Sequence, residues 1–348
     1  MKFLFRTDAS INIGSGHLMR CLTLADQLRC NGGEVAFICR DLSGSMFDVL
    51  QARGYQSSRL SWTDERMEPQ LRDAEETIRA AQDLFSDKPD WLVVDHYQLE
   101  ARWEAALRPY VCKIMAIDDL ANRQHDCDIL LDQNYESVDR YRERVTRQCR
   151  LLLGPSFALL RPEYAAYRMS MRPRDNVPQK VLIFFGGTDQ PDMTGLSLEV
   201  LSQSEFRHLK VDIVVGSNYQ HRSKLNMQAA LRPNTVIYGS RPHLADLMAR
   251  ADLAIGAGGV TNWERMCLGL PSLVIAIAEN QVPISELLHE EGAIRYLGRA
   301  ETVTTKIIEN ALAEEIGMQL YEQRAKIAKS KCDGQGVSRV VNALLAMH

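Results

Sequence analysis

The stretch Leu253–Pro271, LAIGAGGVTNWERMCLGLP, shows the local pattern from which the predicted fold is built. Its first three residues are apolar and predict a buried strand, and a helix is expected from near Val260, after the glycines. Gly269 and Pro271 predict the end of that helix, directly before another apolar run at Ser272–Ala276. The succession of strand, glycine turn, helix and strand is typical of a parallel α/β sheet.

The same alternation fills the chain in two consecutive series. Strands of the first series are predicted at Lys2–Arg6, Glu34–Arg40, Trp91–Val94, Lys113–Ile117 and Ile129–Leu131. Strands of the second series are predicted at Lys180–Phe185, Val211–Val215, Thr235–Tyr238, Leu253–Ile255 and Ser272–Ala276. Intervening helices include Gly16–Arg29, Arg241–Arg250 and Gly336–Met347. We predict an α/β protein of two Rossmann-like domains, with parallel sheets facing across a cleft at their ligand-binding strand ends.

A length of 348 residues suggests about two domains. The charged segment Arg161–Gln179 contains three prolines and is the predicted linker, although its first half is compatible with a helix. We expect an N-terminal domain over residues 1–165 and a C-terminal domain over residues 176–330. Residues 331–348 are expected to form a terminal helix, with the option of crossing back to the first domain.

The composition is that of an ordinary globular protein, with 45% hydrophobic and 25% charged residues. A formal net charge of -4 provides no general attraction to nucleic acid or anionic membrane. We identify no signal peptide and no membrane span, and the eight cysteines form no C-x-x-C pair. We therefore expect a cytoplasmic protein without metal or cofactor, whose cysteines are small buried residues.

The segment Gly14–Arg20, GSGHLMR, opens the first predicted helix. Its glycines permit close approach of a ligand, and unpaired N–H groups at a helix start attract anions. The third glycine of a dinucleotide site is missing, so a surface loop with an incidental histidine also fits. His17 lies in the first helical turn, where the helix dipole should favour the neutral imidazole that a general base requires.

The segment Gly258–Glu264 offers a second anion site, because a helix start near Val260 would present N–H groups to a diphosphate. Glu264 follows about one turn later, where its carboxylate could accept both hydroxyls of a ribose. A solvated helix glutamate is the simpler alternative for this residue.

Polar groups also follow three other predicted strands, in Phe184–Asp189 (FFGGTD), Val93–Tyr97 (VVDHY) and Asp118-Asp119. Catalytic side chains collect at such strand ends in α/β sheets. The alternatives are a plain turn after the first of these strands and helix N-capping by the aspartates, which we favour for Asp119.

These motifs together resemble one enzyme family. They are RTDAS-x₃-GxGH-x₂-RC at Arg6–Cys21, VDHY at Val94–Tyr97, IDDLANR-x-H-x-CD-x-LLDQNY at Ile117–Tyr135, GPSFALLRPEY at Gly154–Tyr164, FGGTD at Phe185–Asp189 and the block Gly258–Glu264. Over about residues 1–300 the chain is similar to the UDP-2,4-diacetamido-2,4,6-trideoxy-β-L-altropyranose hydrolases of pseudaminic acid biosynthesis. The second domain also resembles MurG-type GT-B glycosyltransferases, and the region 41–90 is longer than in some family members.

The resemblance implies a GT-B fold, with UDP held mainly by the second domain. It also implies metal-independent hydrolysis to UDP and the free sugar with inversion, with His17 as the base that activates water. The partners would be the UDP-linked sugar and UDP, and the free sugar would go to flagellin or to a surface polysaccharide. We expect a monomer that binds neither nucleic acid nor membrane. The expected substrate-binding positions are Gly14, Gly16, Arg20, Tyr97, Arg161, Gly187, Thr188, Gly258, Gly259, Thr261, Asn262, Glu264, Asn280 and Gln281.

Other functions stay open at this stage. A GT-B glycosyltransferase would use the same fold with an acceptor hydroxyl in place of water. A nucleotide-sugar sensor would bind without turnover. A dinucleotide oxidoreductase is disfavoured by the missing third glycine and by the absence of a Tyr-x-x-x-Lys pair in the cleft motifs.

Overall fold

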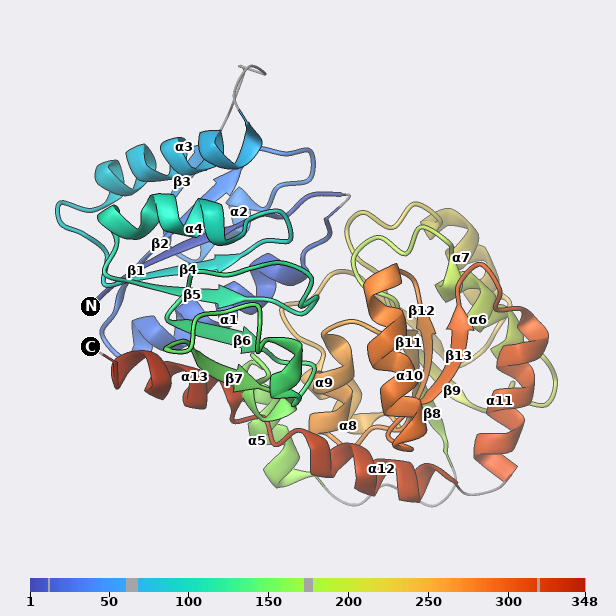
Figure 1. The fold of residues 1–348 in the computed structure, drawn as a ribbon. Coiled ribbons are helices and arrows are strands. Elements are labelled where there is room, and N and C mark those ends of the chain that lie inside the picture. The colour runs from blue at the N-terminus through green and yellow to red at the C-terminus, as the bar shows by residue number, and fades with distance from the viewer. Residues whose placement is uncertain (12, 61–67, 172–177, 318–319, 348) are drawn as a thin grey trace. The chain divides into compact units, whose positions relative to one another are not determined.

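The computed structural model describes residues 1–11, 13–60, 68–171, 178–317 and 320–347. The chain separates into two compact units, one made of Met1–Leu160 with Gln335–His348 and the other of Arg161–Gly334. Each unit contains one parallel sheet (Figure 1), which confirms the predicted α/β class. The first half of the predicted linker forms helix α5 (Pro162–Ser170), whereas residues 172–177 of that linker lie outside the described residues.

The sheet of the first unit has seven parallel strands in the order β3-β2-β1-β4-β5-β6-β7. Their bounds are β1 (Lys2–Thr7), β2 (Glu34–Arg40), β3 (Gln56–Leu60), β4 (Trp91–Asp95), β5 (Lys113–Ile117), β6 (Ile129–Asp132) and β7 (Arg150–Leu153). The chain builds outward from β1 in one direction and then from β4 in the other. Open α/β sheets bind ligands at such a switch point, outside the carboxyl ends of the strands.

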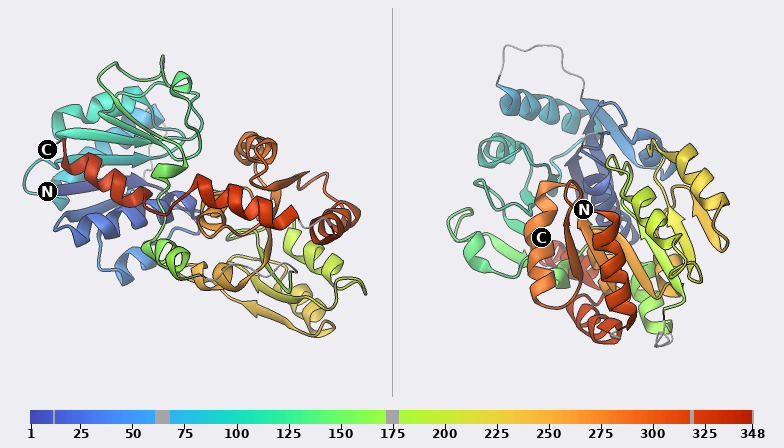
Figure 2. Two further views of the ribbon diagram at one scale, coloured as in Figure 1. Left: turned by 90° about the horizontal axis from the view of Figure 1, so that it is seen from below. Right: turned by 90° about the vertical axis from the view of Figure 1, so that its right-hand side faces the viewer.

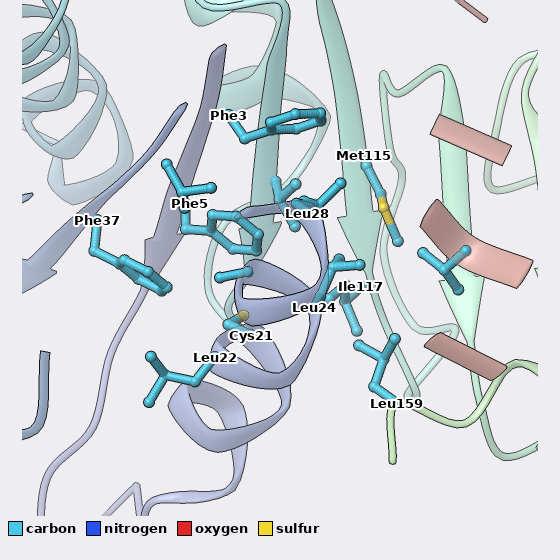
Figure 3. Packing of buried hydrophobic residues seen from close by; sticks show 14 of the residues in the cluster. Phe3, Phe5, Cys21, Leu22, Leu24, Leu28, Phe37, Met115, Ile117 and Leu159 are labelled. Carbon is cyan, nitrogen blue, oxygen red and sulfur yellow. The ribbon is translucent and has the colours of Figure 1, made fainter. Parts of the chain in front are cut away.

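Helices cover both faces of this sheet (Figures 1 and 2). They are α1 (Gly16–Cys30), α2 (Phe47–Ala52), α3 (Pro69–Leu84), α4 (Ala101–Leu107) and α13 (Gly336–Leu345). Alternate residues of β1 face opposite layers. Phe3 and Phe5 pack beside α1 (Figure 3), in a cluster that also contains α13 residues, whereas Leu4 packs in the cluster that α3 and α4 complete. The last helix of the chain therefore belongs to the core of the first unit.

The second unit repeats the same strand order, β10-β9-β8-β11-β12-β13. Its strands are β8 (Lys180–Phe184), β9 (Lys210–Val214), β10 (Thr235–Tyr238), β11 (Leu253–Ala257), β12 (Ser272–Ala276) and β13 (Arg295–Arg299). Its other helices are α6 (Met193–Leu201), α7 (Arg222–Ala230), α8 (Ala245–Arg250), α9 (Thr261–Cys267), α10 (Val282–Glu290), α11 (Thr305–Gly317) and α12 (Leu320–Lys331). Short 3₁₀ turns occur in the two units at Arg108–Tyr110, Val138–Arg140, Pro155–Phe157 and Glu279–Gln281.

Three strands were not predicted, namely β3, β7 and β13, and each lies at the edge of its sheet. Edge strands are exposed on one side, so their sequences, such as QSSRL in β3, lack a strong apolar pattern. The predicted helix Arg241–Arg250 is also too long, because only Ala245–Arg250 is helical.

The expectation that the cysteines are buried is wrong for two of them. Cys30 and Cys112 are exposed and Cys149 is partly buried, whereas the other five are buried. All eight are free thiols.

We predict that Leu344→Ala lowers the free energy of unfolding of the first unit by about 2–5 kcal/mol, because this α13 side chain is fully buried against the core. The shift can be measured by urea denaturation. The exposed Asn342 of the same helix provides the control, since Asn342→Ala should change stability by less than about 0.5 kcal/mol. Equal effects of the two substitutions would show that α13 is not part of this core.

Candidate active site

In the first unit, His17 meets a carboxylate at the end of a neighbouring strand. His17 is the second residue of α1, and Asp95 is the last residue of β4, next to β1. Both side chains are buried, and His17 Nδ1 lies 2.6 Å from Asp95 Oδ1. Because an ionised carboxylate only accepts hydrogen bonds, we assign the ring proton to Nδ1. This tautomer leaves Nε2 as the proton acceptor of the imidazole.

Arg20, one turn further along α1, binds the same carboxylate at both oxygens. Its Nε lies 2.6 Å from Asp95 Oδ2 and its Nη2 lies 2.7 Å from Asp95 Oδ1. Burial opposes the ionisation of Asp95, but the nearby Arg20 and His17 outweigh it and lower the pKa of this carboxyl. Asp95 is therefore a carboxylate at neutral pH. The guanidinium of Arg20, a predicted substrate contact, is thus engaged within the protein.

Tyr97 is brought together with His17, as the motif predicts. The two rings pack edge to face, with centroids 4.5 Å apart and planes at 83°. Burial and the charge of Asp119 raise the pKa of Tyr97, so its hydroxyl stays protonated at neutral pH. This neutral hydroxyl hydrogen-bonds the Asp119 carboxylate, so Tyr97 joins the imidazole to that residue.

His96, between Asp95 and Tyr97, has a different partner. Its Nε2 lies 3.1 Å from Asp8 Oδ2, and its Nδ1 accepts the N–H of Gln98. Asp8 also receives Arg6 Nη1 at 2.6 Å in a fully buried ion pair. His96 therefore ties the end of β4 to the start of the loop that leads to His17.

Asp118 and Asp119, which follow β5, have exchanged the roles expected from the sequence, where capping was favoured for Asp119. Asp118 caps the turn by accepting the N–H groups of Leu120 and Ala121. Asp119 does not cap a helix; its Oδ2 lies 3.2 Å from Arg20 Nη1. The prediction for Asp119 is wrong because the described segment after β5 is a turn, which Asp118 already satisfies.

The glycines before His17 leave room beside the start of α1. Gly14 has φ +80, and its N–H donates to Ser10 O at 2.8 Å. A Cβ atom placed at Gly14 or Gly16 would meet no heavy atom within 4 Å. This part of the loop is therefore compatible with the close ligand approach predicted for both glycines.

In the second unit, the loop after β11 is braced by a side chain predicted to contact substrate. Gln281 Oε1 accepts the N–H groups of Gly258 and Ile277, each at 3.1 Å. A Cβ atom on Gly258 would lie 2.5 Å from Ser285 Oγ, so tight packing requires glycine there. The N–H of Gly258 is therefore committed to Gln281, which leaves the diphosphate fewer donors than the sequence suggests.

Asn262, another predicted substrate contact, is buried inside the same loop. Its Nδ2 donates to Gly258 O at 3.1 Å, and its Oδ1 accepts from Arg265 Nη2. Arg265 also donates to Ala257 O at 2.8 Å. Burial lowers the pKa of Arg265 to about 10, which keeps it charged at neutral pH. Asn262 and Arg265 thus hold the loop from within.

Glu264 is partly buried, in contrast to a solvated helix glutamate. Burial raises its pKa to about 7, against the opposing effects of a hydrogen bond with Tyr164 and the charges of Arg265 and Arg161. The carboxyl group therefore changes its charge near neutral pH. Perturbed carboxyl groups of this kind cluster at functional sites.

The remaining predicted residues of this unit lie around the switch point of the second sheet. Gly187 is exposed and follows β8. Its backbone lies close to Gly216, because a Cβ atom on Gly216 would be 2.1 Å from Gly187 O. Thr188 and Arg161 are partly buried, and Arg161 Nη2 pairs with Glu163 at 3.0 Å. Asn280 is exposed, and Thr261 Oγ1 lies 3.5 Å from Arg265 Nη1. Gly259 would meet only Gln281 Nε2, at 3.7 Å, on gaining a Cβ atom.

Two residues of the candidate site, Asp95 and Arg265, were not among the site residues predicted from the sequence. Asp95 stood in the VDHY motif, so its position at a strand end was a usable signal. Arg265 carried no such signal, because an arginine that follows a helical glutamate usually indicates a solvated surface.

Among the residues that the structure covers, no group of three or more His, Cys, Asp or Glu side chains could hold a metal ion. In those same residues, no helix has the length and apolar character needed to cross a bilayer.

No family model matches the chain. It is 29% identical over 295 residues to the UDP-2,4-diacetamido-2,4,6-trideoxy-beta-L-altropyranose hydrolase of Campylobacter jejuni, covering 84% of this chain and 97% of that protein. It is 26% identical over 221 residues to the spore coat polysaccharide biosynthesis protein SpsG of Bacillus subtilis, covering 62% of this chain and 64% of that protein.

Solved structures match over nearly the whole chain. MurG of Acinetobacter baumannii has a TM-score of 0.67 at 15% identity and covers 100% of both chains. The chain has the GT-B fold. UDP-GlcNAc 2-epimerase of Neisseria meningitidis, bound to UDP-GlcNAc, has a TM-score of 0.66 at 14% identity and covers 99% of this chain and 100% of its own. Sequence identity this low supports the fold alone.

We predict that the Glu264 carboxyl group titrates near pH 7, neutral below this pH and ionised above it, because burial disfavours its charge. Carbon NMR of the side-chain carboxyl, assigned by its loss in Glu264→Gln, measures the midpoint. An unperturbed glutamate carboxyl group titrates at about pH 4.3. A midpoint for Glu264 near that value would contradict the burial argument.

Proposed function

We propose that the chain is a UDP-sugar hydrolase in which His17 activates water. The observation that carries the proposal is the 2.6 Å contact between His17 Nδ1 and Asp95 Oδ1, which leaves Nε2 as the acceptor of a proton. The similarity to the Campylobacter hydrolase over most of both chains supports the reaction class. The proposed substrate is UDP-2,4-diacetamido-2,4,6-trideoxy-β-L-altropyranose, an intermediate of pseudaminic acid biosynthesis.

In the proposed reaction, His17 Nε2 accepts a proton as the water oxygen bonds to the anomeric carbon. The bond from that carbon to the UDP oxygen breaks, and UDP leaves with the bonding electron pair. A single displacement from the face opposite UDP inverts the anomeric configuration. Asp95 keeps the imidazole in the required tautomer and stabilises the imidazolium that forms. The neutral hydroxyl of Tyr97, which hydrogen-bonds Asp119, is proposed to contact the substrate as well.

The proposal assigns nucleotide recognition to the second unit. Glu264 accepts hydrogen bonds from the ribose hydroxyls, and the loop around Gly259 and Thr261 faces the diphosphate. Asn280, Arg161, Gly187 and Thr188 complete the proposed contacts. Gln281, Asn262 and Arg265 act indirectly by holding the loop, because their side chains bind its backbone or one another.

The proposal also covers the metal requirement, the cellular location and the oligomeric state expected from the sequence. The reaction uses His17 and the departing UDP without a metal ion, and the protein acts in the cytoplasm as a monomer. The product is a free diacetamido sugar for glycosylation of flagellin or of a surface polysaccharide.

The proposal is tested by following the purified protein with the UDP-linked diacetamido sugar by NMR in isotopically labelled water. We expect free sugar with inverted anomeric configuration, with the oxygen label in the sugar and not in UDP. Label in the UDP phosphate, or retention of configuration in the first product, would contradict the proposed displacement.

A glycosyltransferase is the second candidate, because it would use the same GT-B fold, which the chain shares with MurG. Incubation with the UDP-sugar and no acceptor separates the two functions. A hydrolase releases equal amounts of UDP and free sugar, whereas a transferase leaves the UDP-sugar largely intact until an acceptor hydroxyl is supplied. The non-catalytic sensor would bind a UDP-sugar and release neither product.

We predict that His17→Asn lowers kcat by about 10²–10⁴-fold, the usual contribution of a positioned general base, while UDP binding is retained. The exposed His208 provides the matched control, and His208→Asn should leave kcat unchanged. Steady-state kinetics and calorimetric titration with UDP measure the two effects. Near-normal turnover of His17→Asn would remove His17 from the catalytic role.

We predict that Glu264→Gln raises the Michaelis constant about tenfold or more with little change in kcat, because ribose contacts are made equally in the ground and transition states. The affinity of the wild-type protein for the UDP-sugar should increase as the pH rises through about 7, where the carboxylate forms. This increase should vanish in Glu264→Gln and persist in the surface control Glu199→Gln. A fall in kcat with unchanged binding would contradict the ribose assignment.

A further inference from the structure

Arg20, which lies against both His17 and Asp95, also binds the carboxylate of Asp119. Arg20 contacts Asp95 through Nε and Nη2, and its remaining terminal nitrogen, Nη1, lies 3.2 Å from Asp119 Oδ2. The side chains of Arg20 and Asp95 are almost completely buried, and only 13% of the Asp119 side chain is exposed. Four side chains from α1, β4 and the turn after β5 thus form one closed charge cluster, which we call the base cluster: His17, Arg20, Asp95 and Asp119.

The proton that His17 accepts must be stabilised within this cluster. Arg20 alone would neutralise Asp95, because it binds both oxygens of that carboxylate, and would then repel a proton on His17. Asp119 offsets the charge of Arg20, so the cluster with neutral His17 carries one net negative charge. Protonation of His17 makes the cluster neutral, which is favourable where charges are buried.

We propose that Asp119 is a positioning residue that keeps His17 basic by compensating the charge of Arg20. Asp119 acts through Arg20 and needs no contact with the substrate. The proposal rests on the proposed role of His17 as the base. It also explains why the carboxylate after β5 is turned toward α1, while its neighbour Asp118 alone caps the turn.

The other titratable groups around His17 supply no competing charge. Burial, together with the charge of Asp119, raises the pKa of Tyr97. Burial also raises the pKa of Cys21, whose Sγ lies 3.6 Å from Asp95 Oδ2. Both groups are therefore neutral at neutral pH. His96 donates toward Asp8 within the separate ion-pair network of Arg6, Asp8, Asp73 and Arg40, in which two arginines balance two aspartates.

Arg140 is the other cation near Asp119. Its Nη2 donates to the backbone oxygen of Asp119 at 3.2 Å, and its Nε lies 3.6 Å from Asp132. Arg140 is thus paired with another carboxylate, whereas the Asp119 side chain pairs with Arg20 and hydrogen-bonds the neutral Tyr97. Removal of the Asp119 charge should therefore act mainly on the base cluster.

The test measures the pKa of His17 directly, by NMR titration of the histidine-labelled full chain without substrate. In Asp119→Asn, we expect this pKa to fall by about one unit, from the Coulomb interaction across one guanidinium at an effective dielectric constant of about 20. In Asp139→Asn, which removes one exposed carboxylate from the same unit, the pKa should stay within about 0.2 units, since exposed charges are screened. Asp119→Glu, which keeps a carboxylate at this position, should leave the pKa of His17 close to its value in the wild type. An unchanged or higher pKa in folded Asp119→Asn overturns the proposal.

A second variant covers the case in which Asp119→Asn fails to fold. Arg20→Gln removes the cation and leaves both carboxylates, so the pKa of His17 should move in the opposite direction, upward. A fall or no change in folded Arg20→Gln overturns the proposal as well. A general loosening of the fold would move the pKa of His17 in the same direction in both variants, so opposite shifts identify a charge effect.

Kinetics then separate this inference from the proposed function. In an active enzyme that carries Glu264→Gln, whose affinity for substrate no longer titrates near pH 7, the acidic limb of kcat/KM should move to lower pH in Asp119→Asn by the same amount as the NMR pKa. If the wild type hydrolyses no UDP-sugar, the proposed function fails while the NMR titration still decides the role of Asp119. If hydrolysis is confirmed but neither the NMR pKa nor the acidic limb moves, only the inference about Asp119 fails.

Discussion

The first unit depends on the buried carboxylate of Asp95 and on the donors that satisfy it. A buried carboxylate without partners would be destabilising. Asp95 is held ionised by His17 and by the Nε and Nη2 groups of Arg20. These contacts lock the first turn of α1 onto the end of β4, across the switch point of the sheet. The same interaction that makes the fold tolerate this charge also selects the imidazole tautomer with a basic Nε2. Stability and candidate chemistry therefore arise from one set of hydrogen bonds.

The second unit uses the same strand order in a different way. Its loop after β11 is held by amide and guanidinium groups, Gln281, Asn262 and Arg265, which bind backbone carbonyl and N–H groups. Such bracing makes a loop rigid and leaves few side chains to approach a ligand. Glu264 stands apart because it is partly buried without a bidentate cation, and burial holds its pKa near 7. The same strand order thus supports a histidine–carboxylate pair in the first unit and a glycine loop held by side chains in the second.

The comparisons show why the fold cannot choose the reaction. MurG and a UDP-GlcNAc 2-epimerase share the GT-B fold with this chain at 14–15% identity. The difference must lie in a few groups near the reacting carbon. A histidine already oriented by a carboxylate is suited to taking a proton from water, and this is the local feature on which a hydrolase interpretation depends.

The sequence by itself determined the alternation of strands and helices, the parallel sheets and the position of His17 at a helix start. Interior strands such as β4 and β12 are buried throughout and contain four consecutive apolar residues each, so the local pattern suffices to find them. Edge strands such as β3 (QSSRL) and β13 (RYLGR) were missed because neither contains the run of buried apolar residues that marks an interior strand. Only the tertiary structure decided that Asp95 binds His17, that Asp119 rather than Asp118 joins Arg20, and that Asn262 turns inward. Each of these contacts joins side chains whose burial and direction depend on packing between separate elements or within a folded loop. A local sequence pattern carries no information about that packing.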